Sequence, residues 1–241
     1  MMTRISKKLK SFLLPHIKRT SYYEEMWTVR TKQDVEHYIP TQDRASRSWL
    51  AEKISASLKD LKIEAPKILE IGCDLGANLY SLRKIVPASS ELVGIDIAPA
   101  SISAAKEFLD TLGVSDIAFH VARADDLEMF NDNYFDVVFT DAVLLYLADD
   151  KINQAIREMA RVSKKLLFLL ELSPKLVRKS SYHSSDGWIR DYELLIQTGN
   201  IECDIKVESV TKEVRSAGRW PSQGKLIKLT SPNGFCQGQS S

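Results

Sequence analysis

The sequence of 241 residues contains only three cysteines, and they lie far apart. Cys73, Cys203 and Cys236 form no CxxC pair, which argues against a secreted disulfide framework and against a zinc cluster. An apolar run of roughly 20 residues, the length that crosses a bilayer, is also missing. With 44% hydrophobic and 27% charged residues and a mean hydropathy of −0.19, the composition predicts one globular domain in a reducing cytoplasm, without a metal site.

An excess of charge of one sign is likewise missing, because 33 basic residues face 32 acidic ones. We therefore expect no nucleic acid partner. The distribution is uneven, since residues 1–20 contain several lysines and arginines and no acidic residue. Their apolar stretch ends at Pro15, too early for a secretory signal. Its helical spacing is typical of a helix docked on its own domain or of peripheral contact with an anionic membrane.

From residue 46 onward, short apolar runs alternate with helical patterns. We expect helices at 46–61, 77–85, 100–112, 151–162 and near 188–198, and strands at 68–71, 91–95, 117–121, 135–140 and 166–170. The strands are continuous and rich in β-branched residues, as in a parallel sheet covered on both faces. Two further runs follow at 204–214 and 225–230, the first alternating like a pair of edge strands. The sequence thus predicts an α/β, doubly wound, mostly parallel sheet.

The flanking segments lack this alternation. Residues 21–45 are polar and aromatic and predict an irregular cap, which together with the basic arm forms a first region, 1–45. Residues 46–230 form the predicted ligand-binding domain. Residues 231–241 predict a flexible tail.

Glycine is scarce, with ten in the chain, and two of them follow the strand predicted at 68–71. Gly72 and Gly76 stand in the turn before the next helix, where ligands bind in open α/β sheets and a missing Cβ permits close approach. Asp96 ends the next strand, where an acid binds ribose hydroxyls. Glu70 and Asp74 add two carboxylates, which would repel a pyrophosphate but suit a cationic, amino-acid-bearing ligand such as S-adenosylmethionine.

Four segments together resemble the class I S-adenosylmethionine-dependent methyltransferases. They are EIGCDLG at 70–76, VGIDI at 93–97, FDVVF at 135–139 with AVLLYL at 142–147, and REMARV at 157–162. The resemblance covers residues 45–172 and continues more loosely to 230. It implies a Rossmann-like sheet of seven strands with an N-terminal helical cap, S-adenosylmethionine as the cofactor, and methyl transfer as the activity.

The resemblance also implies roles for individual residues. Gly72 and Gly76 would line the methionine part of the cofactor, and Glu70 would order the loop or bind the amino group. Asp96 would bind the ribose hydroxyls, and Ile97 would pack on adenine. The remaining predicted cofactor residues are Cys73, Asp74, Asn78, Ala124, Asp125 and Thr140. We expect Cys73 to be a packing residue rather than a nucleophile, since nothing nearby in sequence would lower its pKa.

The chain departs from the family at two positions. After the third strand the family usually has Gly-Asp-Ala, whose acid binds the adenine amino group, whereas this chain has Ala122-Arg123-Ala124. Arg123 is expected to be solvent-exposed, and Asp125 or Asp126 is the candidate replacement for the missing acid. Asp74 stands where the family more often has glycine, and aspartate tolerates left-handed backbone better than most residues.

Candidates for the acceptor side follow the fourth and fifth strands. Methyl transfer from a sulfonium needs alignment and, for hydroxyl acceptors, a general base. Asp141, Glu171 and His183 are the predicted catalytic residues, with a surface histidine as the alternative for His183. Residues 180–192 combine aromatic and hydrogen-bonding side chains, and with Glu171 they resemble, at low specificity, methyltransferases of surface-sugar biosynthesis. We therefore expect a small-molecule or glycan acceptor, with methylation of a hydroxyl or amino group of a sugar or nucleotide sugar.

Two other functions stay open at this point. A lipid or quinone methyltransferase is favoured if the basic arm binds membrane. A non-catalytic S-adenosylmethionine-binding protein is suggested by Arg123. Methylation of a nucleic acid base is not expected, because no Asn-Pro-Pro-aromatic segment follows the fourth strand.

Overall fold

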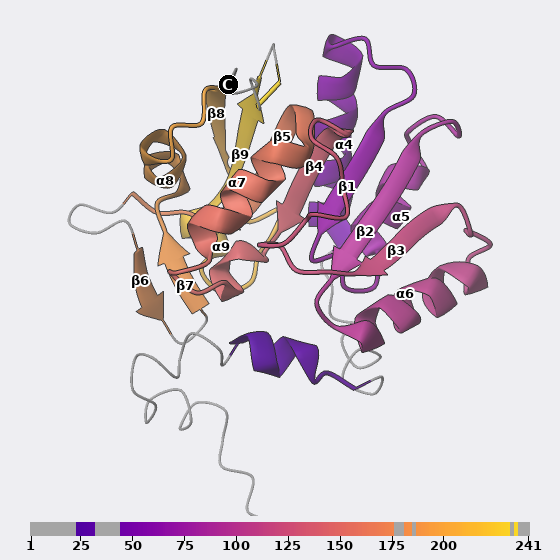
Figure 1. The fold of residues 1–241 in the computed structure, drawn as a ribbon, viewed down its shortest axis with the longest axis horizontal. Helices are drawn as coiled ribbons and strands as arrows, with labels where there is room; N and C mark the ends of the chain where they lie inside the picture. Colours follow the sequence, from indigo (N-terminus) through magenta and orange to yellow (C-terminus); the bar gives the residue numbers. More distant parts are fainter. Residues whose placement is uncertain (1–22, 32–43, 176–180, 185–186, 232–233, 236–241) are drawn as a thin grey trace, which may run out of the picture.

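The computed structural model describes residues 23–31, 44–175, 181–184, 187–231 and 234–235. They form a seven-stranded sheet in the order β3-β2-β1-β4-β5-β9-β8 (Figure 1). Its strands are β1 (Lys67–Ile71), β2 (Glu91–Asp96), β3 (Ile117–Val121), β4 (Phe135–Asp141), β5 (Ser163–Leu172), β8 (Asp204–Ser209) and β9 (Gly224–Thr230). β1 to β5 run parallel, whereas β9 is antiparallel to both β5 and β8. The expected doubly wound, mostly parallel sheet is confirmed.

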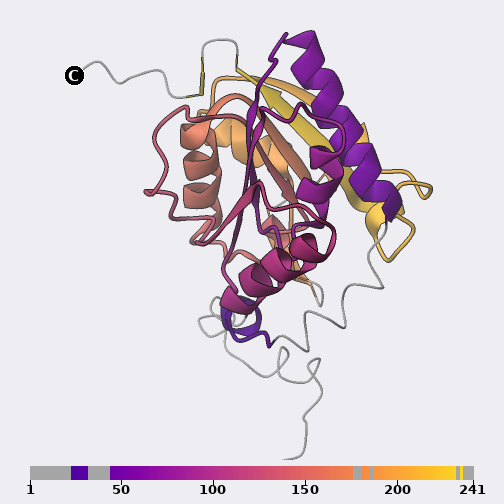
Figure 2. The same cartoon turned by 90° about the vertical axis from the view of Figure 1, so that its right-hand side faces the viewer.

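Helices cover both faces of the sheet, as the two apolar clusters of the core show. α4 (Arg44–Asp60), α5 (Ala77–Arg83) and α6 (Pro99–Thr111) pack on one face, and α7 (Ile152–Val162) and α8 (Tyr192–Thr198) pack on the other. The central strands are apolar on both sides because both sides are covered; Leu69 and Val138, for example, are fully buried. Figure 2 shows the sheet edge-on between these two layers.

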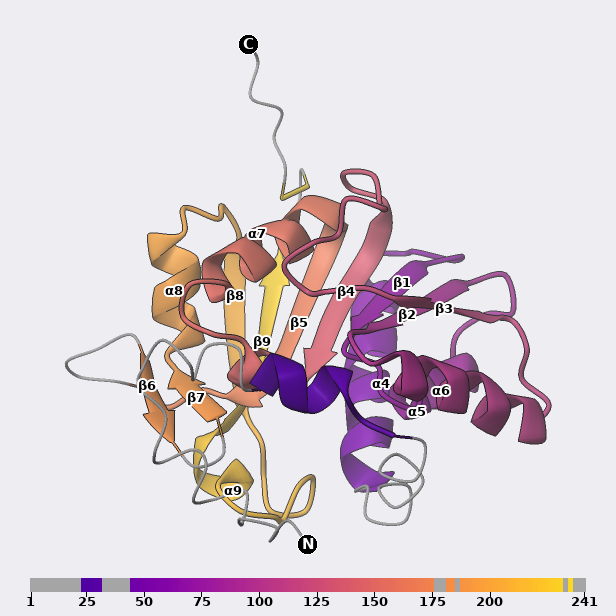
Figure 3. The same cartoon turned by 60° about the horizontal axis from the view of Figure 1, so that its bottom comes forward.

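The carboxyl ends of the parallel strands meet at one edge of the sheet, which is where ligands bind in this architecture. The strand order reverses between β1 and β4, since β2 lies on one side of β1 and β4 on the other. Residues 23–28 form a short helix, not the expected irregular segment, and it lies across this edge (Figure 3). We call residues 23–30 the roof.

Several boundaries differ from the sequence prediction. The run 204–214 forms one edge strand, β8, because the chain leaves the sheet after Ser209. Residues 181–190 form a hairpin of β6 (Ser181–Ser184) and β7 (Gly187–Arg190), so the last predicted helix starts only at Tyr192. Asp191 caps that helix, accepting a hydrogen bond from the Leu194 N–H at 3.1 Å.

The two ends of the chain are described only in part. The predicted basic arm, residues 1–20, lies outside the described residues. In the tail expected to be flexible, Phe235 packs against the core on the α7 side of the sheet. Within the described ranges, no helix combines the length and the apolar character needed to cross a bilayer.

Candidate functional site

A cavity of about 810 Å³ lies at the carboxyl ends of the parallel strands. Its walls come from the turns after β1 and β2, the loop after β4, the roof, the start of α4, and residues 212–220 between β8 and β9. Most of the residues predicted to bind the cofactor or to act on the acceptor line it: Glu70, Gly72, Cys73, Asp74, Asn78, Asp96, Ile97, Ala124, Asp125 and Asp141.

The turn after β1 is held close to β2 by its backbone. The N–H groups of Gly72 and Cys73 both donate to the carbonyl of Ile95, at 2.8 and 2.9 Å. Gly72 has a φ of 71°, and a Cβ there would overlap the Val143 side chain. Asp74 has a φ of 46°, in the left-handed region that aspartate tolerates better than most residues. Position 72 therefore requires glycine for two reasons, the positive φ and the close approach of the Val143 side chain.

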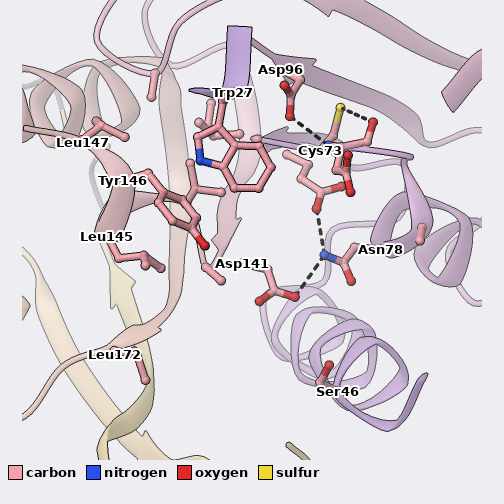
Figure 4. Close-up of a pocket in the computed structure, with 18 of the residues that line it drawn as sticks. Trp27, Ser46, Cys73, Asn78, Asp96, Asp141, Leu145, Tyr146, Leu147 and Leu172 are labelled. Carbon is pink, nitrogen blue, oxygen red and sulfur yellow. Dashed lines mark hydrogen bonds between the residues drawn. The ribbon is translucent and has the colours of Figure 1, made fainter. Parts of the chain in front are cut away.

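Asp96 connects two turns at the end of β2. Its carboxylate accepts hydrogen bonds from the Asp74 N–H at 3.0 Å (Figure 4) and from the Ala98 N–H at 2.9 Å. Burial raises the pKa of Asp96 to about 6, although these two hydrogen bonds oppose the shift. Each carboxylate oxygen keeps a further lone pair, so the group can still accept two hydroxyl hydrogen bonds.

A chain of three polar side chains lies beside this turn. Asn78 Nδ2 donates to Glu70 Oε1 at 2.8 Å and to Asp141 Oδ2 at 3.3 Å (Figure 4). Burial raises the pKa of Glu70 well above its usual range, and Asp141 adds to the effect. Glu70 Oε2 and Asn78 Oδ1 are buried without a hydrogen-bond partner in the described parts of the chain. Such buried acceptors are costly unless a ligand or water satisfies them.

Three predicted site residues are not on the cavity wall. A Cβ on Gly76 would lie 2.7 Å from the Phe119 ring, so this glycine permits packing between the turn and β3. The Thr140 side chain is fully buried. Glu171 is also fully buried, and its Oε1 accepts the Val143 and Leu144 N–H groups, both at 3.0 Å. The structure thus corrects Glu171 from an acceptor-facing base to a residue that positions the loop after β4.

Two other predictions concern cysteine and arginine. Burial raises the pKa of the Cys73 thiol well above its usual range, which agrees with a packing role. Arg123 is half-buried rather than solvent-exposed, because its guanidinium pairs with Glu24 and with Asp125, both at 2.9 Å. The acid that the family usually has at this position is thus replaced by a cation that recruits an acid from the roof.

The roof is fastened to both sides of the cavity. Glu24 accepts from Lys151 at 2.6 Å in addition to Arg123, and Arg30 pairs with Asp74 at 2.8 Å. Burial raises the pKa of Glu24, but the hydrogen bonds from Arg123 and Lys151 outweigh it and lower the pKa below its ordinary value. Trp27 meets the Tyr146 ring edge-on at 4.9 Å, and Figure 4 shows it between Tyr146 and the loop of Cys73.

Sequence reasoning missed two arginines of the cavity wall. Arg47 lies at the start of α4, and Arg215 lies after β8. Arg215 Nη2 donates to the two carboxylate oxygens of Asp141, at 2.7 and 2.9 Å, and to Ser46 Oγ at 3.2 Å. Its guanidinium stacks on the Trp220 ring at 4.0 Å. No local motif marks Arg215, since its contact with Asp141 joins positions 74 residues apart.

The hairpin places the other acceptor candidates. His183 pairs with Trp188 in the β6–β7 ladder, and its side chain lies outside what the structure describes. Trp188, Arg190 and Tyr192 are buried, and Arg190 donates to the carbonyls of Leu144 and Leu147 in the loop after β4. These three side chains of the predicted acceptor region 180–192 are therefore not exposed for contact with an acceptor.

Comparison with known proteins agrees with this geometry. Residues 68–165 match a family model described as a methyltransferase domain. The match covers less than half of the chain, and over these residues the chain is similar to methyltransferase domains. The matched region includes the turns of Glu70, Gly72 and Asp96 and ends within β5.

Solved structures share the fold of this chain at low identity. An S-adenosylmethionine-dependent methyltransferase from Aquifex aeolicus has a TM-score of 0.57 at 18% identity, over 83% of this chain and 97% of that one. Magnesium protoporphyrin IX methyltransferase from Synechocystis, solved with S-adenosylmethionine bound, has a TM-score of 0.54 at 13% identity, over 95% and 99% of the two chains.

Among curated proteins, an uncharacterized protein of Haemophilus influenzae is 26% identical over 148 residues, which are 61% of this chain and 53% of that one. The matched region spans about half the length of the first curated relatives or less. The class of acceptor must therefore be inferred from the residues of this chain.

Proposed function

We propose that this protein transfers the methyl group of S-adenosylmethionine to a small-molecule acceptor bound in the same cavity. The observation that carries the proposal is the set of acidic groups on one wall. Glu70, Asp74 and Asp96 surround a glycine turn and lie where a cationic nucleoside would bind. The cavity of about 810 Å³ lies high in the range of small-molecule sites, roughly 300–1,000 Å³, so it has room for more than one small ligand.

The residues fit this cofactor in detail. Glu70 Oε2 and Asn78 Oδ1, buried without partners among the described residues, would accept from its ammonium group. Asp96 would accept from the ribose hydroxyls. The Gly72 backbone has no Cβ to obstruct the methionine part. Asp125 and Ala124 stand on the wall beside Ile97, where the adenine ring is predicted to lie.

When bound, S-adenosylmethionine supplies a methyl group activated by the sulfonium. The chain contributes alignment and exclusion of water, which favour an in-line displacement. Trp27 and Tyr146 cover the cavity from the roof and from the loop after β4. Glu171 holds that loop in place through two backbone N–H groups.

We propose that the methylated group is a hydroxyl or amino group of a sugar or nucleotide sugar, with His183 as general base, on the support of the polar composition of residues 180–184. Asp141 is less suited to this role, because Arg215 and Asn78 already engage its carboxylate. In a His183→Ala variant we expect loss of turnover with cofactor binding retained. Full turnover would remove the base assignment.

The proposed function is tested with labelled cofactor. We expect S-adenosylhomocysteine to bind in calorimetry and labelled methyl groups to appear in one class of compounds, when the protein is incubated with fractionated sugars, lipids and small metabolites. Binding without any transfer would favour the non-catalytic alternative. Transfer to lipid alone would favour the membrane-surface alternative, whose basic arm lies outside the described residues.

A further inference from the structure

We propose that the acceptor is an organic anion, and that Arg47 and Arg215 bind its carboxylate or phosphate group. This inference rests on the proposed function and names its substrate class. The two arginines line the end of the cavity marked by Ser46 and Asp141, whereas Asp96 lies at the opposite end (Figure 4).

Arg47 is a half-buried cation on the cavity wall. Within the described ranges it makes no hydrogen bond or ion pair. Burial lowers its pKa, and the fields of Asp141 and Glu70 oppose that effect. A guanidinium that loses hydration and gains no direct hydrogen bond from the described residues is costly, so a bound anion would offset the cost.

Arg215 is held rigidly and still has donors to offer. Its hydrogen bonds to described residues all use Nη2, toward Asp141 and Ser46. Nη1 and Nε have no partner in the part of the chain that the structure describes. Stacking on Trp220 fixes the plane of the guanidinium. A preorganised planar fork of this kind suits a carboxylate or phosphate.

Charge divides the cavity into two ends. At the end formed by α4 and residues 212–220, four cations face two acids: Arg47, Lys212, Arg215 and Arg219 against Asp141 and Glu213. At the other end, acidic side chains outnumber basic ones. The cofactor is itself a net cation with a single carboxylate, so it complements the acidic end and leaves the basic end in excess. An anionic acceptor restores the balance.

The basic end adjoins an apolar wall, which indicates the rest of the acceptor. Leu172 is paired with Gly224 in the β5–β9 ladder, and Trp220 packs closely on Gly224. Leu145 and Tyr146 continue the wall toward the roof (Figure 4). A molecule with an apolar or aromatic body and one anionic group matches both surfaces.

The first experiment compares three probes of one shape. The protein is saturated with S-adenosylhomocysteine and titrated with benzoate, phenyl phosphate and neutral benzamide, with binding measured by ligand-observed NMR. We expect the anions to bind at least about tenfold more tightly than benzamide, the gain typical of a charge-assisted contact. Comparing the affinities for benzoate and for phenyl phosphate then shows which of the two anionic groups the site prefers. Equal binding of all three probes would overturn the proposal.

Variants localise the effect. In Arg47→Gln and Arg215→Gln we expect the preference for anions to fall by about tenfold each, since each removes one charged partner. Arg47→Gln is the cleaner change, because it leaves no described side chain without its partner. Arg157→Gln, an exposed arginine on α7 far from the cavity, is the matched control and should keep the preference. A preference that persists in both cavity variants contradicts the assignment.

A second experiment excludes the other source of a carboxylate, the cofactor itself. The same variants are titrated with S-adenosylhomocysteine and with 5′-methylthioadenosine, which lacks the amino-acid end. Unchanged affinity for S-adenosylhomocysteine in Arg215→Gln, together with a lost anion preference, supports the proposal. If both variants lose about tenfold for S-adenosylhomocysteine alone, the arginines bind the cofactor carboxylate and the proposal fails.

The two proposals fail in different ways. A wild-type protein that binds neither nucleoside contradicts the proposed function, and its anion preference can still be measured without a nucleoside. A protein that binds both nucleosides but shows no anion preference contradicts only the inference about the acceptor.

Discussion

The two ends of the cavity are built from different kinds of contact. The end around Asp96 comes from two consecutive strand-to-helix turns, and backbone hydrogen bonds fix its geometry, such as those from Gly72 and Cys73 to Ile95. The end around Arg215 joins α4, residues 212–220 and the loop after β4 through side chains. The geometry of backbone turns depends little on the side chains, whereas an end built from side-chain contacts changes when those side chains are substituted. This difference suits a constant cofactor and a variable acceptor.

The largest effect is expected from a substitution at the end around Asp96, called here the fixed end. Asp96→Ala removes the acceptor of the ribose hydroxyls and the two backbone hydrogen bonds that order the turns. We expect S-adenosylhomocysteine to bind about a hundredfold more weakly, since two charge-assisted hydrogen bonds are lost. Calorimetry measures the affinity. Asp116→Ala, whose side chain is mostly exposed and lies away from the cavity, is the control.

The next prediction separates backbone strain from steric overlap. Gly72 and Gly113 both have a φ of 71°, but only at Gly72 would a Cβ meet another side chain. Gly113→Ala should cost about 1 kcal/mol of unfolding free energy, and Gly72→Ala about 2–4 kcal/mol because Val143 must also move. Urea denaturation measures both. Equal losses would show that the close approach of Val143 has no energetic weight.

A third prediction concerns Glu171, whose carboxyl group accepts hydrogen bonds from the loop after β4. Burial raises the pKa of Glu171 from 4.5 to about 7, although the Leu144 and Val143 N–H groups oppose the shift. The protonated form is thus favoured by folding, so the stabilisation is full below pH 4.5 and is lost as the pH rises through about 7. Glu171→Gln should remove this dependence and gain roughly 1–3 kcal/mol relative to wild type between pH 5 and 8.

The measurement is urea denaturation at several pH values. Glu128→Gln, at an exposed position, is the matched control and should follow the wild-type curve. Parallel curves for wild type and Glu171→Gln would contradict a buried carboxyl that titrates with folding.

The smallest expected effect concerns the roof. Glu24→Gln weakens the pairs with Arg123 and Lys151, which are partly exposed and therefore modest in energy. We expect S-adenosylhomocysteine to dissociate a few-fold faster in stopped-flow measurements. The difference from wild type should be smaller at high salt, because salt already screens these ion pairs in the wild type. Glu25→Gln, on the exposed side of the same helix, should have the wild-type rate. Equal rates in both variants would separate the roof from cofactor exchange.

The fixed end could be predicted from the sequence because its determinants are local. The glycine turn and Asp96 lie next to apolar strands, so their spacing alone brings them together. The end around Arg215 could not, since Arg215 meets Asp141 and Ser46 only after β8 and β9 have joined the sheet. The hairpin was missed for a related reason. Trp188 and Ile189 look helical by spacing, but pairing with β6 keeps them in a strand.

Burial also changes the role of residues whose place along the chain was predicted correctly. Glu171 was found at the end of the fifth strand, as expected, but its carboxylate faces the loop backbone rather than the cavity. Sequence position predicts where a residue stands along a strand. Which of its atoms reach the cavity depends on the packing of both faces.

The shared carboxylate of Glu24 has a consequence for the comparison of related sequences. Arg123 obtains one of its two partners from a residue 99 positions earlier, and Lys151 depends on the same oxygen. Positions 24 and 123 should consequently change together across relatives. A chain with an acid at 123 would leave Lys151 as the remaining described partner of an acid at 24. The pair is therefore a sequence marker that would divide these proteins into two subgroups.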